Sequence, residues 1–282
     1  MSRTLTFRWI ATLSAAILFA VPSGAHAQGR GGRHPRSDAA KRLWRPSSDS
    51  ISSIDDDESV TLHFSSPADS LSWLRGRSLA RKSTGLRIVV SLQERHLWAI
   101  AGHDTLLSAP VAVAKGTTLE YGSEKWHFTT PRGMRTVQSK DADPIWQPPE
   151  WLYAETAVEN GLKLRHLNYG EKVHLSDGRV LTILNGTAGL IDTDGSFGEL
   201  PTDEHIVFGD YLYMPPMGSK NRKVEGELGK YKLSLGDGYL LHGTPDKQSI
   251  GMAATHGCIR LRDEDIEWLY DNVPVGTKVY IY

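Results

Sequence analysis

Cysteine is nearly absent from this sequence, since one of its 282 residues is a cysteine. No disulfide can therefore form within the chain, and a zinc site built on several thiolates is excluded. An excess of basic charge is also missing, because the formal net charge is -1, and we expect no nucleic-acid partner. Hydrophobic residues make up 39% and charged residues 23%, which argues against a wholly disordered chain and against a polytopic membrane protein.

Long apolar runs are lacking too, except for a short one near the N-terminus. Two arginines precede an apolar stretch over residues 9–21, and Ala25-His26-Ala27 follows as a small-residue cleavage site. This pattern predicts a secretory signal peptide, residues 1–27, and an exported protein of the periplasm or cell envelope. An uncleaved membrane anchor is the alternative, although the run is short of the roughly 20 residues that a span needs.

Residues 28–65 are interpreted as a low-complexity linker in which the two signs of charge are separated. Six basic residues lie between positions 28 and 46, and five acidic residues lie between positions 47 and 59. Apolar residues are few, so the stretch cannot bury enough surface to offset the entropy of ordering it. We predict a solvated tether; contact of its basic part with an anionic envelope polymer is the alternative.

The rest of the chain is predicted to be mainly β, a sandwich or barrel with few short helices. Ser66-Pro67-Ala68-Asp69 is typical of a helix start and predicts a lead-in helix over about 67–82, within a segment 66–85 that Gly85 closes. A second helix is predicted to begin at Asp263, which caps it. The expected strands cover residues 86–92, 96–101, 105–114, 173–175, 180–184, 206–214, 231–235, 239–241 and 278–282.

The single cysteine, Cys258, lies in a segment that also contains two histidines, His242 and His256. A small buried hydrophobe is one interpretation of such a cysteine. Gly257 before it permits tight backbone geometry and close approach of a substrate, and a neighbouring base turns a thiol into a useful nucleophile. In extended chain His256 shares a face with Cys258, whereas His242 can reach it from a neighbouring strand. These residues predict a catalytic cysteine.

The segment also resembles the signature of the L,D-transpeptidase (YkuD-type) family. A His-Gly pair at His242 lies sixteen residues ahead of the cysteine of Thr255-His256-Gly257-Cys258. Weaker similarities are Thr-Pro-Arg-Gly at 130–133, Trp-Gln-Pro-Pro at 146–149 and Leu-Gly-Lys-Tyr at 228–231. The resemblance covers residues 86–282, which we expect to form the catalytic domain.

The resemblance implies a role for each matching residue. Cys258 would be the nucleophile, and His242 the base that takes its proton. The backbone carbonyl of Gly243 would orient His242 in place of a triad carboxylate. Backbone N–H groups around His256, Gly257 and Cys258 would form the oxyanion hole, and His256 would assist proton movement.

Substrate binding is assigned by the same resemblance to Arg260 and Thr255. The planar guanidinium of Arg260 suits a carboxylate of a peptide stem; a surface ion pair is the alternative for this arginine. The implied partners are peptidoglycan stem peptides, with a tetrapeptide as acyl donor and a diamino acid as acceptor. No metal and no organic cofactor is implied.

The implied reaction is acyl transfer through a thioester on Cys258, which links the third residues of two stems. Two alternatives stay open: a carboxypeptidase or hydrolase that delivers the same thioester to water, and a noncatalytic wall-binding module. A wall-attached protein is a further acceptor to consider. Inhibition by carbapenems is also implied.

An extra segment at about 152–205 does not match a minimal domain of this family. A lid or substrate wall is one hypothesis for it, and a surface decoration is the other. Its loop 192–198 is acidic but lacks the spacing and terminal glutamate of an EF-hand calcium loop. The remaining histidines show no H-x-H or H-E-x-x-H arrangement, so zinc is not expected there.

Overall fold

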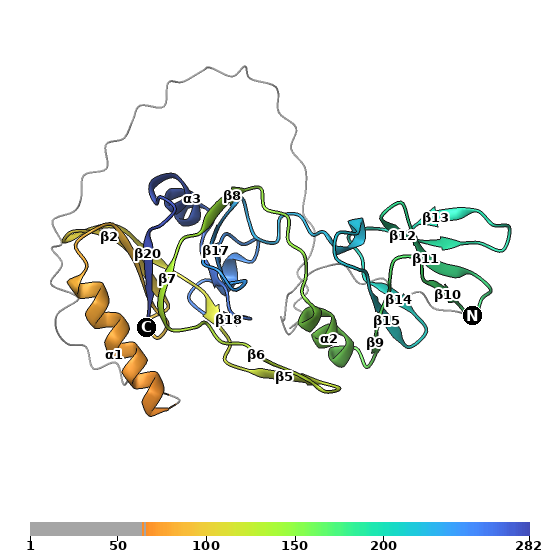
Figure 1. Cartoon of the computed structure of the whole chain (residues 1–282), viewed down its shortest axis with the longest axis horizontal. Helices are drawn as coiled ribbons and strands as arrows, with labels where there is room; N and C mark the ends of the chain where they lie inside the picture. The colour runs from red at the N-terminus through yellow and green to blue at the C-terminus, as the bar shows by residue number, and fades with distance from the viewer. Residues whose placement is uncertain (1–63, 65) are drawn as a thin grey trace, which may run out of the picture. The chain divides into compact units, whose positions relative to one another are not determined.

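The computed structural model describes residues 64 and 66–282 (Figure 1). The predicted signal peptide and nearly all of the predicted linker lie outside these described residues. The described chain is mainly β and contains three α-helices, in agreement with the predicted class. None of its helices is both long enough and apolar enough to cross a membrane.

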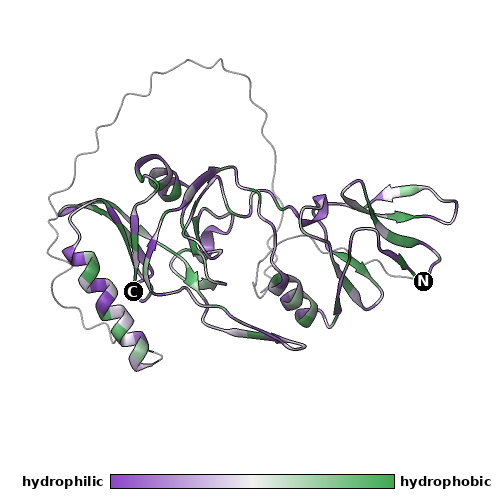
Figure 2. Cartoon of the chain, in the orientation of Figure 1, coloured by the Kyte–Doolittle hydropathy of each residue, from purple (hydrophilic) through white to green (hydrophobic). Residues whose placement is uncertain are grey.

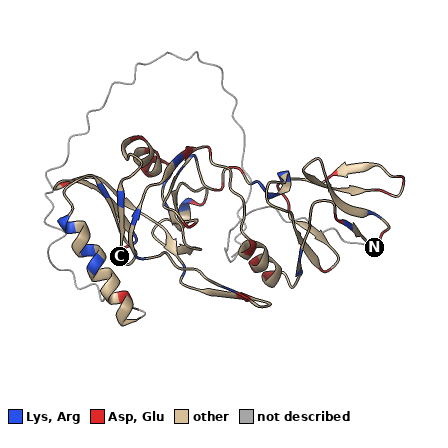
Figure 3. Cartoon of the chain, viewed as in Figure 1, with Lys and Arg blue, Asp and Glu red and all other residues tan. Residues whose placement is uncertain are grey.

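Helix α1 (Pro67–Lys82) is the predicted lead-in helix. The hydroxyl of Ser66 caps it by accepting a hydrogen bond from the N–H of Asp69 at 3.1 Å. Its buried residues Trp73, Gly76 and Ala80 face the end of the chain, and Figure 3 shows basic residues along the rest of the helix. The Trp73 ring meets that of Tyr282 edge to face at 5.9 Å, so aromatic packing fixes the helix against the last strand.

The first sheet brings together the two ends of the catalytic domain. Its strand order is β3-β2-β1-β20-β7. The predicted meander forms its first three strands, and the closing strand β20 pairs with β1 in parallel. The strands are β1 (Arg87–Ser91), β2 (His96–Ala101), β3 (Asp104–Pro110), β7 (Gly133–Thr136) and β20 (Lys278–Ile281).

A second sheet carries the segment with His242 and borders Cys258. Its strand order is β19-β17-β16-β8. Next to it, β18 (Ala253–Thr255) pairs in parallel with β4 (Val113–Ala114). The strands of the sheet are β8 (Ser139–Ala142), β16 (Tyr231–Ser234), β17 (Leu240–His242) and β19 (Ile259–Arg260).

Helix α3 (Asp263–Asn272) packs on β16 and completes one hydrophobic core between the two sheets. The prediction that Asp263 caps this helix was wrong: Arg262 holds the N-cap position, and its side chain makes no capping bond. Asp263 is instead the first helical residue, where its negative charge suits the positive end of the helix. Figure 2 shows the apolar strands that form the interior. Fully buried members of this core include Ile88, Leu97, Leu233, Leu241, Ile259, Leu261, Ile266 and Leu269.

The extra segment begins with a helix that the sequence interpretation missed. Helix α2 (Glu150–Glu159) follows two prolines and has an acid in its first turn. The strands after it form a sheet of order β14-β15-β9 and another of order β10-β11-β12-β13. These strands are β9 (Lys163–His166), β10 (Lys172–His174), β11 (Val180–Leu184), β12 (Thr187–Ile191), β13 (Phe197–Glu199), β14 (Ile206–Phe208) and β15 (Tyr211–Met214). They enclose a core of their own around Leu167, Leu181, Ala188 and Tyr213.

Two expected strands are each divided in the structure. The stretch 105–114 separates into β3 and β4, because β4 leaves the first sheet to pair with β18. The stretch 206–214 is a hairpin of β14 and β15, because Gly209 turns the chain with a φ of 57°. The hairpin β5 (Thr118–Tyr121) with β6 (Glu124–His127), and the 3-10 helices Lys220–Arg222 and Lys247–Ser249, complete the elements of the described chain.

Candidate active site

Strands β17 and β19 bring His242 close to the residues around Cys258. The two strands are parallel, with Leu241 opposite Ile259 and His242 opposite Arg260. Leu241 and Ile259 both point into the hydrophobic core, where they are 0% and 1% exposed. Because side chains alternate along a strand, His242 and Arg260 point to the other face. Cys258 lies directly before β19, and the charge of Arg260 acts on the pKa of its thiol.

The ring of His242 has a defined tautomer. Its Nδ1 lies 2.6 Å from the carbonyl oxygen of Gly243, and a carbonyl oxygen can only accept, so Nδ1 carries the hydrogen. Nε2 therefore keeps a free lone pair. Burial, helped by the positive charge of Arg260, lowers the pKa of His242 to about 3. The imidazole is neutral at neutral pH, and its Nε2 is able to take a proton.

The thiol of Cys258 is partly exposed and lies 3.9 Å from the carbonyl oxygen of Gly238. Burial of the sulfur raises the pKa of this thiol, while the backbone of Leu240 and the charge of Arg260 act in the opposite direction. A thiol with a raised pKa beside a neutral imidazole rests as an uncharged pair. For this sulfur to act as a nucleophile, its proton would have to leave as the new bond forms.

Gly257 is required by the space around it. Its φ is 151°, and a Cβ at this position would lie 3.1 Å from Cε1 of Tyr239 and 3.4 Å from the carbonyl oxygen of Thr129. The first contact is tighter than most side chains make, so Tyr239 would have to shift, and residues with a side chain rarely adopt this φ. The absence of a side chain lets the backbone on the N-terminal side of Cys258 pack closely against Tyr239.

Two buried hydroxyl groups shape the loop between β18 and β19. The Thr255 hydroxyl donates to the carbonyl oxygen of Cys258 at 2.6 Å and accepts from the N–H of Gly257 at 3.2 Å. The Thr130 hydroxyl donates to the carbonyl oxygen of Gly257 at 3.0 Å and accepts from the N–H of Ala114 at 3.1 Å. Thr255 is 2% exposed, so the structure gives it loop contacts where a substrate contact was expected. Thr130, from the Thr-Pro-Arg-Gly segment, was not predicted to take part.

His256 faces α2 rather than the sulfur of Cys258. Its Nε2 lies 2.7 Å from Oε2 of Glu155, and Nζ of Lys115 lies 2.5 Å from the other carboxylate oxygen. The imidazole stacks on the Trp151 ring at 4.1 Å and meets the Phe128 ring edge to face at 4.5 Å. Sequence reasoning missed Glu155 and Lys115 because neither belongs to the cysteine segment. Trp151 lies just after the Trp-Gln-Pro-Pro match and was the one available signal.

The Nε2 atom of His256 lies between two charged groups. Burial alone would raise the pKa of Glu155, but hydrogen bonds and charges from His256 and Lys115 together lower it. An ionised carboxylate only accepts hydrogen bonds and an ammonium only donates them, and Oε2 of Glu155 and Nζ of Lys115 lie 2.7 Å and 3.0 Å from this Nε2. Of the two histidines of the cysteine segment, His242 is therefore the one whose Nε2 is not occupied by Glu155 and Lys115.

Arg260 is held by two acids of the chain. Its Nη1 lies 3.5 Å from a carboxylate oxygen of Asp246, and its Nη2 lies 4.0 Å from one of Glu227. Burial raises the pKa of Glu227, an effect that the positive charge of Arg260 opposes and the charge of Asp246 reinforces. The stem carboxylate predicted to bind Arg260 would meet a guanidinium that already has carboxylate partners.

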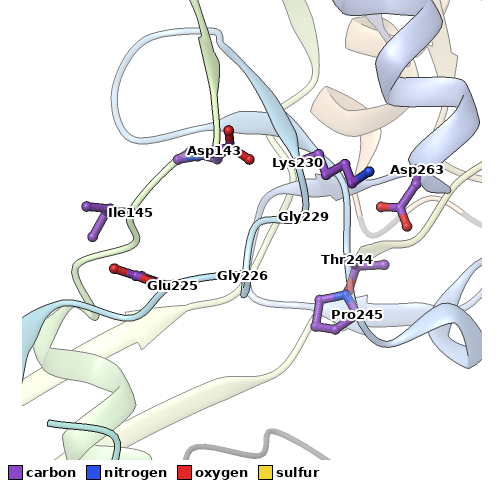
Figure 4. Close-up of a pocket in the computed structure, with 10 residues that line it drawn as sticks. Asp143, Ile145, Glu225, Gly226, Gly229, Lys230, Thr244, Pro245 and Asp263 are labelled. Carbon is purple, nitrogen blue, oxygen red and sulfur yellow. The ribbon is translucent and has the colours of Figure 1, made fainter.

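A surface hollow of about 710 Å³ lies beside the residues that follow His242 (Figure 4). Thr244 and Pro245 form part of its wall, and Asp143, Glu225, Lys230 and Asp263 bring charge to it. Gly229 lines it as well and touches the backbone of Gly243. Within the described part of the chain, no group of three or more His, Cys, Asp or Glu side chains is placed to hold a metal ion.

Comparison with known proteins gives similar sequences in several bacteria. The ErfK/SrfK protein of Escherichia coli (strain K12), described as a probable L,D-transpeptidase, is 47% identical over 57 residues, which are 20% of this chain and 18% of that protein. The YkuD protein of Bacillus licheniformis is 37% identical over 110 residues, or 36% of this chain and 64% of that protein. The matches therefore span between about a fifth and two thirds of these relatives.

Among solved structures, the L,D-transpeptidase of Xylanimonas cellulosilytica is 17% identical and superposes with a TM-score of 0.35 over 72% of this chain and 62% of that chain. The sequence model of the YkuD family, the L,D-transpeptidase catalytic domain, matches residues 85–281. This range covers well over half of the chain and includes both histidines and Cys258. The chain therefore belongs to the L,D-transpeptidase catalytic domain (YkuD) family.

Proposed function

We propose that this protein is a cysteine-dependent L,D-transpeptidase that crosslinks the stem peptides of peptidoglycan. One observation carries the proposal: His242 donates through Nδ1 to the Gly243 carbonyl, which leaves its Nε2 free, and its strand β17 pairs with β19, the strand that begins directly after Cys258. A backbone carbonyl here performs the orienting task of the carboxylate in a Ser-His-Asp triad.

In the first half-reaction the sulfur of Cys258 attacks the carbonyl carbon of the third residue of a tetrapeptide stem. Nε2 of His242 takes the thiol proton as the carbon–sulfur bond forms, which avoids an isolated thiolate in a buried site. Backbone N–H groups of the loop around Cys258 stabilise the negative charge on the carbonyl oxygen. The protonated His242 then gives its proton to the amine of D-alanine, which leaves as the peptide bond breaks.

In the second half-reaction an amine replaces D-alanine. The side-chain amino group of a diamino acid in a second stem attacks the thioester carbon, and Nε2 of His242 takes a proton from that amine. The carbon–sulfur bond breaks, and the proton returns to the sulfur of Cys258. The product is an amide between the third residues of two stems, and the reaction needs no cofactor.

We assign substrate contacts near the base to Arg260 and a supporting role to Thr255. A stem carboxylate would bind Arg260 by replacing Asp246 or Glu227, which lie 3.5 Å and 4.0 Å from the guanidinium. Thr255, with both its hydrogen bonds made inside the loop, would act on the substrate by holding Gly257 and Cys258 in place.

The substrate lies outside the cytoplasm, and the proposal therefore includes export by the N-terminal segment. Peptidoglycan stems are the proposed donor and acceptor, and a wall-attached protein is an acceptor of the same amine chemistry. Incubation of the purified protein with a disaccharide-tetrapeptide, followed by mass spectrometry, tests the assignment. Loss of D-alanine together with a crosslinked dimer is the expected result.

The other outcomes of this experiment separate the competing functions. Loss of D-alanine without a dimer would identify a carboxypeptidase or hydrolase, because the first half-reaction is the same for water as acceptor. An unchanged substrate would favour a wall-binding module that keeps the fold. The Cys258→Ala variant is the control, and it should leave the substrate intact.

A further inference from the structure

We infer that Glu155 is a positioning residue: through His256 it holds the loop that carries Cys258, and it makes helix α2 of the extra segment part of the active site. The inference rests on the proposed function in one respect, which is that this loop stabilises an oxyanion during acyl transfer. Glu155 is 101 residues away from His256 in the chain, and no motif links the two.

The imidazole of His256 is fixed on several sides. Trp151 stacks on it at 4.1 Å with an interplanar angle of 21°, and Phe128 meets it edge to face at 4.5 Å with an angle of 85°. Oε2 of Glu155 lies 2.7 Å from its Nε2, and Nζ of Lys115 lies 3.0 Å from the same nitrogen. Two aromatic contacts set the plane of the ring, while the carboxylate and the ammonium set its rotation within that plane.

Lys115 completes the group and connects it to the loop a second time. Its Nζ donates to Glu155 at 2.5 Å, and its backbone N–H donates to the carbonyl oxygen of Thr255 at 2.8 Å. The side chains of Lys115 and Glu155 are 23% and 17% exposed, and that of His256 is 19% exposed. Charged groups that are buried to this extent are weakly screened by water, so removing one member of the group leaves the charge of the others without a full partner.

Helix α2 is itself anchored where the extra segment leaves the catalytic domain. The backbones of Trp146 and Val224 exchange hydrogen bonds of 2.9 Å and 2.8 Å. Arg222, 4% exposed, donates to the carbonyl oxygens of Pro148 and Pro215 at 2.8 Å and 2.6 Å. Both connections of the segment are therefore fastened at its base, and Glu155 projects from a helix whose start is fixed.

The position of His256 matters because its own peptide leads into the reacting residues. Gly257 and Cys258 follow it directly, and Gly257 already occupies a conformation with a φ of 151°. A rotation of His256 would be transmitted through Gly257, whose N–H and carbonyl oxygen are held by Thr255 and Thr130, to the N–H of Cys258. Glu155 contacts His256 and Lys115, and the inference assigns it an action through His256.

Loss of this positioning role should affect two reactions of the Cys258 sulfur differently. Alkylation of Cys258 by iodoacetamide displaces iodide at a saturated carbon and creates no oxyanion. Acetylation by p-nitrophenyl acetate passes through a tetrahedral oxyanion, so it depends on the loop N–H groups as well as on the sulfur. A defect in the position of the loop should slow acetylation and leave alkylation unchanged.

The experiment compares both rates in Glu155→Gln, Glu155→Leu and the control Glu159→Gln, with the adducts counted by intact mass. Cys258 is the sole cysteine, so each alkylation adduct has one site. Glu159 lies on the same helix and is exposed, so Glu159→Gln is a control that removes the same negative charge from α2. We expect the ratio of acetylation to alkylation to fall about tenfold in Glu155→Leu, a fraction of the 100-fold or more that a lost oxyanion donor costs. A smaller fall is expected in Glu155→Gln, whose amide group can still hydrogen-bond to His256.

Three results would overturn the inference. An unchanged ratio in Glu155→Leu would show that the loop does not depend on this carboxylate. Equal falls in both rates would show that Glu155 supports the fold without positioning the oxyanion groups. A wild-type ratio no higher than that of N-acetylcysteine would show that the loop stabilises no oxyanion. Failure of the proposed function is detected separately, because neither reagent is a peptidoglycan fragment.

Discussion

The Nδ1 atom of His242 lies 2.6 Å from the carbonyl oxygen of Gly243, its own neighbour in the chain. A residue that orients the base from the adjacent position needs no distant acid, and it leaves the ring neutral. With the thiol of Cys258 also uncharged at rest, the base and the nucleophile form no buried ion pair with each other whose desolvation would have to be offset. In the proposed mechanism charge appears when the substrate carbonyl is attacked, where backbone N–H groups can stabilise it.

Replacement of His242 should therefore affect rate more than binding. In His242→Ala we expect kcat for D-alanine release to fall by about 100-fold to 10,000-fold, the usual contribution of a positioned base, with KM changed much less. His256→Ala should lose activity through the shape of the loop, and its residual rate should not respond to added imidazole. Restoration of His256→Ala by imidazole, with no effect on His242→Ala, would reverse the assignment of the base.

The low pKa of His242 also predicts how stability depends on pH. The folded protein holds this ring neutral down to a pKa of about 3, whereas an unfolded histidine titrates near pH 6.5. Between these values the unfolded chain binds more protons, so the free energy of unfolding should decrease as pH falls from about 6.5 towards 3. Burial lowers the pKa of His205 to about 4, and this second histidine contributes in the same window.

Urea unfolding at several pH values separates the two histidines. His242→Gln and His205→Gln should each reduce the slope of unfolding free energy against pH between about pH 4 and 6.5, and the double variant should reduce it further. A slope in His242→Gln equal to that of the wild type would mean that the ring is not held neutral in the folded protein.

Gly229 offers a test of the contact behind the base. A Cβ at Gly229 would lie 2.6 Å from Cα of Gly243, while Gly226, in the same loop, has nothing within 4 Å of its Cβ position. Both glycines have positive φ, of 66° and 78°, so alanine costs about 1 kcal/mol of backbone strain at either site. Gly229→Ala should lose further stability and displace the carbonyl that orients His242. We expect a loss of activity in Gly229→Ala well beyond that in Gly226→Ala, measured as D-alanine release with thermal unfolding as the companion measurement.

Local sequence signals predicted the parts of this fold that depend on neighbouring residues. Ser66 and Pro67 predicted α1 because capping and a fixed φ act within one turn. Short apolar runs with tight connections predicted β1, β2, β3 and β20 of the first sheet, whereas its edge strand β7 was not predicted. The 150–159 helix was missed because Trp-Gln-Pro-Pro was interpreted as a family segment and not as a helix start. Six of its ten residues are apolar, but they form no clear stripe on one face. Packing against the β5 hairpin and strands β9 and β15 stabilises this helix.

The candidate site divides in the same way. Cys258, His242 and His256 stood out because they share one short segment with an unusual lone thiol. Thr130 and Glu155 contact that segment from 127 and 101 residues away, and no local pattern marks a hydroxyl or a carboxylate as the partner of a distant loop. Arg260 was visible in the sequence, but its pairing with Asp246 and Glu227 depends on how two loops meet in space.

Carbapenems should acylate this protein once per chain. The strained β-lactam carbonyl invites attack by the sulfur of Cys258, and ring opening leaves a thioester whose bulk blocks an incoming amine. Intact mass should rise by one drug molecule, because there is one cysteine. His242→Ala should slow formation of the adduct by limiting removal of the thiol proton. Cys258→Ser should give little adduct, because at neutral pH a hydroxyl is a weaker nucleophile than a thiol. Peptide mapping that placed the drug on a serine, or an equal yield from Cys258→Ser, would contradict the thiol mechanism proposed for the site.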